Sequence, residues 1–167
     1  MFINMKRIII IIVVLFISLT LVGQKSLYCT FPQYTPLNTP PMSAKVIGIF
    51  IGSVFLDAIG DGLNDDGFKG WGHALNAAST GLLLVSPFIL DIKLRDIGWY
   101  FASYLFIRMA VFDPMYNLTR DLGIDYIGNT SLWDKAWQRL NPPTNTKMIF
   151  HGLSFSVGIA IPIRHLK

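Results

Sequence analysis

Three aspartates occur at four-residue intervals in one short stretch, at Asp57, Asp61 and Asp65, and His73 follows them. Residues four apart lie along one face of an α-helix, so the three aspartates would form a single acidic stripe. Carboxylates and imidazoles hold divalent cations and act as general acids and bases. We therefore place the centre of any chemistry in this stretch.

Two further ionisable residues are candidates for the same site because they interrupt apolar runs. Arg108 lies inside one long apolar run, and His151 lies near the beginning of another. Ionisable groups in such runs are costly unless they face a partner or a water-filled cavity. The candidate catalytic residues are Asp57, Asp61, His73 and Arg108. The candidate ligands of a divalent metal ion, the one cofactor suggested, are Asp57, Asp61, His73 and His151.

A structural interpretation of the same groups stays open. An ion pair between Arg108 and either Asp57 or Asp61 would hold two helices together. Breaking such a buried pair on one side leaves an uncompensated charge, so both members would matter for stability. The sequence contains no His-Glu-x-x-His motif, which weakens the metal interpretation.

Residues 60–65 resemble the G-D-G-x-N-D magnesium motif of haloacid-dehalogenase-type phosphatases and P-type pumps. They consist of Gly, Asp, Gly, Leu, Asn and Asp in that order. Those families also carry an aspartate nucleophile in an upstream D-K-T-G or D-x-D motif. The sequence contains neither motif, so the resemblance supports no assignment to these families.

Composition indicates the surroundings of the chain. Apolar residues make up 52% of it and charged residues 14%, with a mean hydropathy of +0.48, whereas soluble domains carry about 25% charged residues. We expect the lipid bilayer as the main partner, and other membrane proteins as further candidates. The net charge of +4 comes without a basic block, which argues against nucleic acid as a partner. With Cys29 as the one cysteine, no intrachain disulfide is expected.

Residues 1–23 have the pattern of a signal peptide or signal anchor. Lys6 and Arg7 precede an apolar run that ends at residue 19. This run is shorter than the roughly 20 residues that a spanning helix needs. We expect cleavage before Gln24, as in bacterial signals, with an uncleaved anchor as the alternative. Residues 24–45 hold four prolines and predict an extended linker.

Residues 46–167 contain four apolar runs. Trp and Tyr flank several of them, as at membrane interfaces, and small residues within them permit close helix contacts. A soluble bundle would show polar faces at the helical period, and these runs do not. The sequence predicts an all-α polytopic membrane helical bundle of about four spans in the inner (cytoplasmic) membrane. The runs are 46–59, 74–90, 97–112 and 148–163.

The segment 113–146 separates the third and fourth runs. Asp113 precedes Pro114, a pair that predicts the cap and first residue of a new helix. Ser131 and Asp134 form a capping box. The helix that follows has apolar residues on one side, which predicts a surface amphipathic helix lying on the membrane.

Alternating spans would bring the polar residues to one membrane face. This arrangement favours a structural or interaction protein whose polar cluster stabilises the bundle. The alternative is a membrane-embedded, metal-dependent hydrolase or transferase acting on a phosphorylated or lipid substrate, so enzymatic activity stays open. An ion or solute conductor is disfavoured because no inverted repeat is visible. The residues of this face are Asp57, Asp61, His73, Arg108, Asp113, Asn117, Asp134 and His151.

Overall fold

The computed structural model describes residues 41–128, 132–140 and 144–166, and these residues contain helices and no strand, which confirms the all-α class for them. The signal or anchor and the expected cleavage site lie outside the described residues. The first described helix begins within the segment expected to be linker. The elements are α2 (Met42–Asp65), α3 (Lys69–Ile89), the 3₁₀ turn η2 (Leu94–Asp96), α4 (Ile97–Thr119), α5 (Leu132–Leu140) and α6 (Thr144–His165).

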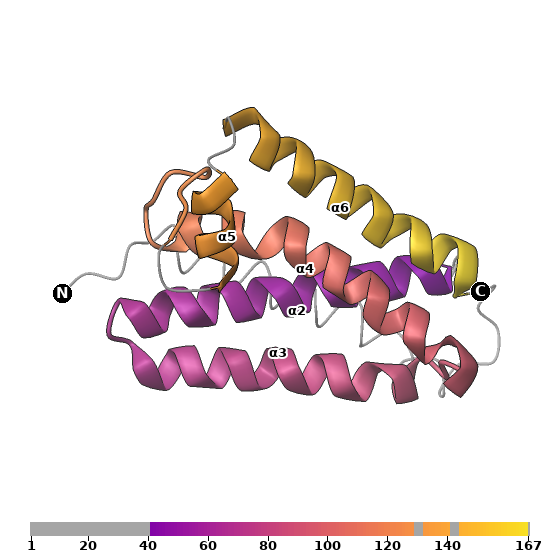
Figure 1. Cartoon of the computed structure of the whole chain (residues 1–167). Coiled ribbons are helices and arrows are strands. Elements are labelled where there is room, and N and C mark those ends of the chain that lie inside the picture. The colour runs from indigo at the N-terminus through magenta and orange to yellow at the C-terminus, as the bar shows by residue number, and fades with distance from the viewer. Residues whose placement is uncertain (1–40, 129–131, 141–143, 167) are drawn as a thin grey trace.

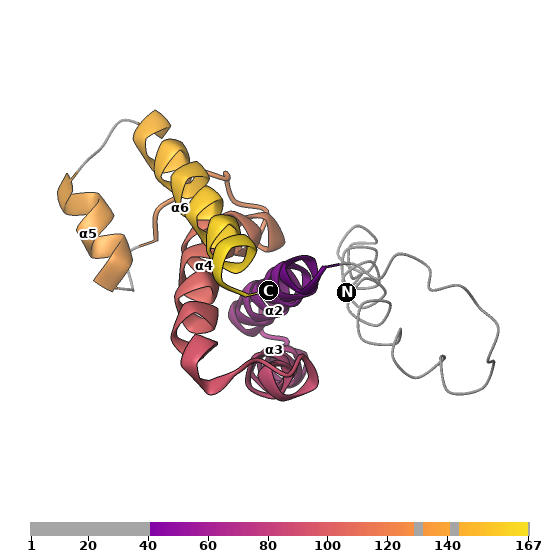
Figure 2. The same cartoon turned by 90° about the vertical axis from the view of Figure 1, so that its right-hand side faces the viewer.

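The helix α2 is the centre of the bundle. It runs antiparallel beside α3 and packs on α4, and α6 crosses over α4 (Figures 1 and 2). The α2–α3 turn, the end of α4, α5 and the beginning of α6 lie at one end of the bundle (Figure 1). At the other end, Trp99 of α4 stacks on His165 of α6, with ring centroids 4.1 Å apart. The long helices therefore alternate in direction, as the apolar runs predicted.

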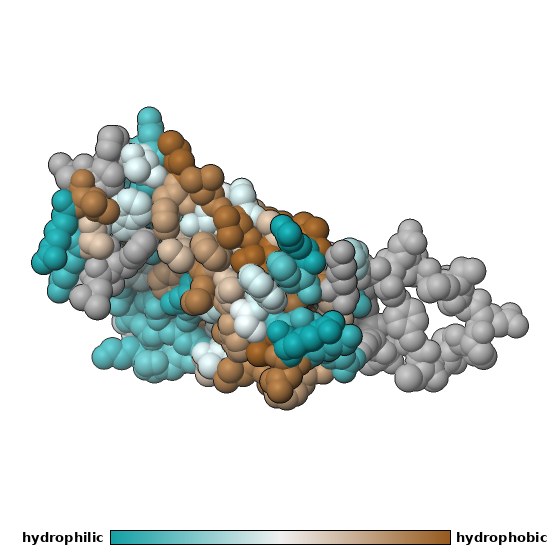
Figure 3. All heavy atoms as spheres, turned by 45° about the vertical axis from the view of Figure 1, so that its right-hand side comes forward, coloured by the Kyte–Doolittle hydropathy of each residue, from teal (hydrophilic) through white to brown (hydrophobic). Residues whose placement is uncertain are grey.

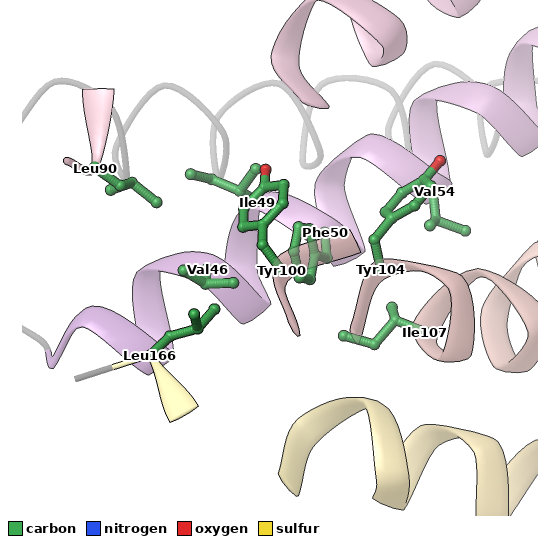
Figure 4. Packing of buried hydrophobic residues seen from close by; sticks show 9 residues of the cluster. All are labelled: Val46, Ile49, Phe50, Val54, Leu90, Tyr100, Tyr104, Ile107 and Leu166. Atoms are coloured by element: carbon green, nitrogen blue, oxygen red, sulfur yellow. The ribbon is translucent and has the colours of Figure 1, made fainter. Parts of the chain in front are cut away.

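The apolar core is built around Phe50 of α2. Its ring makes edge contacts with Tyr100 and Tyr104 of α4, with centroid distances of 4.6 Å and 5.6 Å (Figure 4). Aromatic pairs of this geometry contribute about 0.5–1.5 kcal/mol each beyond the area they bury. The other core residues are Val46, Ile49, Val54, Leu90, Ile107 and Leu166.

Three of the long helices end in the same way. After α2, the Phe68 amide donates to the Leu63 carbonyl at 2.8 Å, and Gly67 between them has a φ of +89°. This is the Schellman motif, in which a left-handed residue closes the helix. Asp91 after α3 and Asp121 after α4 take the same position, with φ of +54° and +57°. The glycine-rich stretch therefore supplies a helix stop at Gly67.

The helix α4 does not end where the sequence predicted. Asp113 caps no new helix, because α4 continues through Pro114 to its end at Thr119. An interior proline removes one helical hydrogen bond. The turn beyond it is held by a hydrogen bond from the Tyr116 hydroxyl to the Asp65 carboxylate of α2. A tertiary contact thus overrides the local stop signal.

Among the described residues, two helices are long and apolar enough to cross a membrane. They are α2, with a mean hydropathy of 1.8, and Asn145–His165 of α6, with a mean hydropathy of 1.3. The expected four spans are therefore not confirmed. The α2 span is mostly buried, as the core helix of a soluble protein would also be, whereas the α6 span is mostly exposed.

Candidate functional site

The polar residues expected to share one membrane face come from α2, the beginnings of α3 and α6, the second half of α4, and α5. These parts lie toward the same end of the bundle (Figure 1). Their side chains form several separate interactions there rather than one cluster. The interactions described below each join residues from two or more helices.

Asp57 of α2 and Arg108 of α4 form an ion pair. The Arg108 guanidinium also lies over the Phe112 ring, 4.2 Å from its centroid. Both side chains are partly buried. Of the two partners expected for Arg108, the structure therefore selects Asp57.

Asp61 of α2 interacts with α3 instead. Its Oδ1 accepts a hydrogen bond from Nδ2 of Asn76 at 2.7 Å. This contact stands where the two helices come closest, because Gly60 on α2 and Gly72 on α3 lack side chains there. A Cβ on Gly60 would overlap the Asn76 side chain, and a Cβ on Gly72 would overlap Asn64. Asp61 thus helps to hold a close helix crossing.

Asp65, at the end of α2, accepts from side chains at the end of α4. Arg120 Nη1 donates to the Tyr116 hydroxyl at 2.9 Å, and that hydroxyl donates to Oδ2 of Asp65. Arg120 also forms an ion pair with Asp65 at 3.3 Å. The hydrogen bond to Tyr116 raises the pKa of the Arg120 guanidinium, so its positive charge is retained. The three side chains join the ends of α2 and α4.

Asp113 of α4 and Lys147 of α6 form an ion pair of 3.8 Å between Oδ2 and Nζ. Lys147 is almost fully buried, with 3% of its surface exposed, and its Nζ donates to the Tyr126 carbonyl at 2.9 Å. Buried ammonium groups require such partners. The pair joins α4, α6 and the segment that follows α4.

His151 of α6 lies one helical turn after Lys147 and is 6% exposed. Its Nδ1 lies 2.8 Å from the Met109 carbonyl oxygen. A carbonyl can only accept, so Nδ1 carries the proton and Nε2 of the neutral ring presents a lone pair. Nε2 is buried and has no hydrogen-bond partner among the described residues. This lone pair distinguishes His151 from the paired groups around it.

The four candidate metal ligands are not brought together in the part of the chain that the structure describes. Among the described residues, no group of three or more His, Cys, Asp or Glu side chains could hold a metal ion. Asp57 is engaged with α4, Asp61 with Asn76, and His73 lies on the exposed surface of α3. His151 is buried between α6 and α4. Helix packing therefore gives each expected ligand a different neighbour.

Two features of this end were missed in the sequence. Gly60-x-x-Leu-Asn64 and Gly72-x-x-Leu-Asn76 repeat one pattern, and this repeat could have indicated the close crossing of α2 and α3. No pattern in the sequence indicated the burial of Lys147, because a lysine near the beginning of an apolar run is expected to extend to the membrane–water interface.

Comparison of the chain with protein-family models, with curated proteins and with solved structures gave no match. Any function therefore has to be argued from the arrangement of its own residues.

Proposed function

We propose that this chain is a small integral membrane protein with a structural or interaction role, whose polar side chains stabilise its own helix bundle. The observation that supports this is the distribution of polar and apolar side chains. Serines and charged groups lie between the helices, and large apolar side chains cover much of the outside. Lipid is the solvent for which this distribution is favourable.

Serine hydrogen bonds cross the helix interfaces. Between α2 and α3, Ser79 Oγ donates to the Ser53 carbonyl at 2.8 Å, and the two hydroxyls lie 3.0 Å apart. Between α4 and α6, Ser103 Oγ donates to the Gly158 carbonyl at 2.6 Å. Hydrogen bonds between small residues of this kind are typical of helix packing in membranes.

The outer surfaces of α3 and α6 are apolar. On the face drawn in Figure 3, hydrophobic side chains cover much of the middle, and hydrophilic side chains gather toward both ends of the bundle. An exposed apolar surface of this extent is unfavourable in water and favourable against lipid chains. Its large members on α3 and α6 are Trp71, Leu84, Val85, Phe88, Ile89, Met148, Ile149, Leu153, Val157 and Ile163.

The four-span arrangement follows from packing if α2 and α6 cross the bilayer. α3 has 21 residues and α4 has 23. Helices of this length extend about 32–35 Å, close to the roughly 30 Å of a hydrocarbon core. Both helices pack along α2, so they would share its depth. We accordingly place the protein in the inner membrane as a multi-pass protein.

The charged pairs favour the structural role over the enzymatic alternative. Asp57, Asp61 and Asp113 each interact with a side chain on another helix. Groups engaged in this way are positioned to stabilise the bundle. The proposed partners are therefore the bilayer and other membrane proteins that contact the apolar outer surface.

Membrane extraction tests the proposal. Membranes from cells that express the full chain would be washed with alkaline carbonate and then with urea. We expect the protein to stay in the pellet after both washes and to dissolve only in detergent. A peripheral protein measured in the same membranes serves as the control for complete washing. Release of the chain by carbonate would contradict integral membrane insertion.

A further inference from the structure

The end of the bundle away from α5 carries an excess of exposed positive charge. Lys93 and Arg95 are exposed in the connection from α3 to α4, and Arg164 is exposed near the end of α6. Among the described residues, Asp91 is the one exposed acidic side chain of this end. Three positive charges and one negative charge leave an exposed net charge of +2. We call the surface formed by Lys93, Arg95 and Arg164 the basic surface.

The opposite end of the bundle has no such excess. Among the described residues, three exposed cations there stand against four exposed aspartates, which leaves an exposed net charge of −1. An anionic partner is therefore attracted to the end away from α5. The exposed charged residues of the α5 end are Asp65, Asp66, Lys69, Asp121, Asp125, Lys135 and Arg139.

The two segments of the basic surface are held together by the stacked rings of Trp99 and His165, whose centroids are 4.1 Å apart. Arg164 directly precedes His165, and Arg95 lies four residues before Trp99, about one helical turn. Arg95 Nε lies 3.5 Å from Oδ1 of its neighbour Asp96, but 76% of the Arg95 side chain is exposed against 24% of Asp96. Exposed pairs of this kind contribute only about 0–1 kcal/mol, so the guanidinium can bind an external anion.

Leu94 lies between the two cations of the connection and is 87% exposed, more than any other large apolar side chain in the described part of the chain. Phe88, near the end of α3, is 82% exposed. Apolar side chains beside cations are unfavourable in water and favourable where acyl chains meet headgroups. The connection lies at that depth if α3 and α4 cross the bilayer, so this inference rests on the proposed membrane location.

We propose that the basic surface binds the phosphate headgroups of anionic phospholipids, and that Leu94 inserts between their acyl chains. The ammonium of Lys93 and the guanidinium groups of Arg95 and Arg164 donate to phosphate oxygens. All three side chains are on the outside of the bundle, so the headgroup reaches them from the bilayer without entering the protein. A zwitterionic headgroup carries its own positive charge, which offsets the attraction. The surface therefore distinguishes phosphatidylglycerol from phosphatidylcholine.

The size of this preference follows from the exposed charge. A lysine or arginine near the membrane surface contributes about 1 kcal/mol toward an anionic lipid, which is about fivefold in affinity. The exposed net charge of +2 then predicts a preference of about 25-fold at low ionic strength. The Debye length falls from about 30 Å at 0.01 M salt to about 3 Å at 1 M, so the preference should largely disappear at high salt.

Lipid titrations of the purified full-length chain test the proposal. Delipidated protein in a non-ionic detergent would be titrated with short-chain phosphatidylglycerol and with short-chain phosphatidylcholine, and the thermal unfolding midpoint would report binding. At low salt, the half-saturating concentration should be about 25-fold lower for phosphatidylglycerol. Equal values for the two lipids, or a preference that does not fall as salt is raised, would overturn the proposal.

Charge-removing variants identify the binding groups. Lys93→Gln, Arg95→Gln and Arg164→Gln should each weaken phosphatidylglycerol binding about fivefold and leave phosphatidylcholine binding unchanged. The triple variant should bind both lipids alike. Because these side chains are exposed, the unfolding midpoint without lipid should differ little from that of the unaltered chain. A phosphatidylglycerol preference that survives the triple variant would overturn the assignment.

Lys135→Gln is the matched control, because Lys135 is an exposed lysine at the α5 end. It should leave the preference unchanged, and a loss as large as that of Lys93→Gln would overturn the location of the site. Leu94→Asn should weaken both lipids alike, by about tenfold, because it removes an acyl-chain contact and no charge. Unchanged binding of both lipids would contradict the insertion of Leu94.

Two further comparisons separate the sources of the phosphate and the two proposals. Free glycerol 3-phosphate, without acyl chains, should bind far more weakly than phosphatidylglycerol, and equal binding would overturn the lipid as the source. Release of the chain by carbonate would contradict the membrane location itself. A carbonate-resistant chain that does not distinguish the two lipids would contradict only the basic surface as a lipid site.

Discussion

The side-chain oxygen of Asn76 on α3 occupies the space in which a Cβ would stand on Gly60 of α2. Asn64 of α2 takes the same position against Gly72 of α3. Both amide oxygens are buried and have no conventional hydrogen-bond partner among the described residues. Each is directed at a glycine Cα, so a Cα–H···O contact accounts for its placement. The absence of side chains at the two glycines therefore sets the spacing of α2 and α3.

Gly60→Ala should destabilise the bundle. The new methyl group would overlap the Asn76 amide and would stand 2.9 Å from the Gly72 carbonyl oxygen. Overpacking of a tight contact costs about 1–3 kcal/mol. The measurement is the free energy of unfolding in detergent, compared with that of the unaltered chain.

Gly81→Ala is the matched control for this prediction. Gly81 lies on the same hairpin, in α3, and nothing stands within 4 Å of its Cβ position. Alanine is favoured over glycine in a helix by about 1 kcal/mol, so the variant should be neutral or more stable. Equal destabilisation by both substitutions would show that α2 and α3 do not depend on the close crossing.

Arg108→Leu should lower the free energy of unfolding by about 3–5 kcal/mol, because Asp57 would be left partly buried without its partner. Combining it with Asp57→Leu should recover much of this loss. Combining it with Asp61→Leu should not, since Asp61 bonds to Asn76 instead. A double-mutant cycle on detergent-solubilised protein measures both couplings.

Two results of this double-mutant cycle would contradict the prediction. Coupling of Arg108 to Asp61 larger than its coupling to Asp57 would contradict the ion pair. Full stability of Arg108→Leu alone would show that the guanidinium is solvated and has no structural role.

Ser53→Ala should cost about 0.6–2 kcal/mol, the range for hydrogen bonds between membrane helices. Ser53 exchanges hydrogen bonds with Ser79 across the α2–α3 interface. Ser156→Ala is the control, because the Ser156 hydroxyl is exposed and bonds to Gly152 of its own helix. A loss of stability as large for the control would indicate that interhelical serine bonds contribute nothing specific.

Cysteines introduced at Lys69 and Lys135 should react alike with a membrane-impermeant thiol reagent, in a background with Cys29→Ser. Both positions are exposed and lie at the same end of the bundle (Figure 1). A cysteine at Lys93, between α3 and α4, should show the opposite reactivity in intact cells. Identical labelling at all three positions would contradict the four-span arrangement.

The sequence alone was sufficient to predict that the described chain is helical and at which end of the bundle the polar groups collect. Apolar runs as long as 74–90 and 97–112 have few alternatives to helix, and alternation of direction follows from their short connections. The amphipathic pattern likewise predicted α5, which the structure places at Leu132–Leu140. These features depend on local composition and chain order.

The tertiary structure decided which polar groups meet. Asp57 and Asp61 lie on one face of α2, so the sequence left both as partners of Arg108, and only the crossing of α2 and α4 selects Asp57. The same holds for His151, whose Nδ1 proton is directed to the Met109 carbonyl by the packing of α6 on α4. Pairing requires atoms within about 3 Å, and helix periodicity places side chains only by face. Distances of that order are set by the crossing of helices, which depends on close contacts such as those at Gly60 and Gly72.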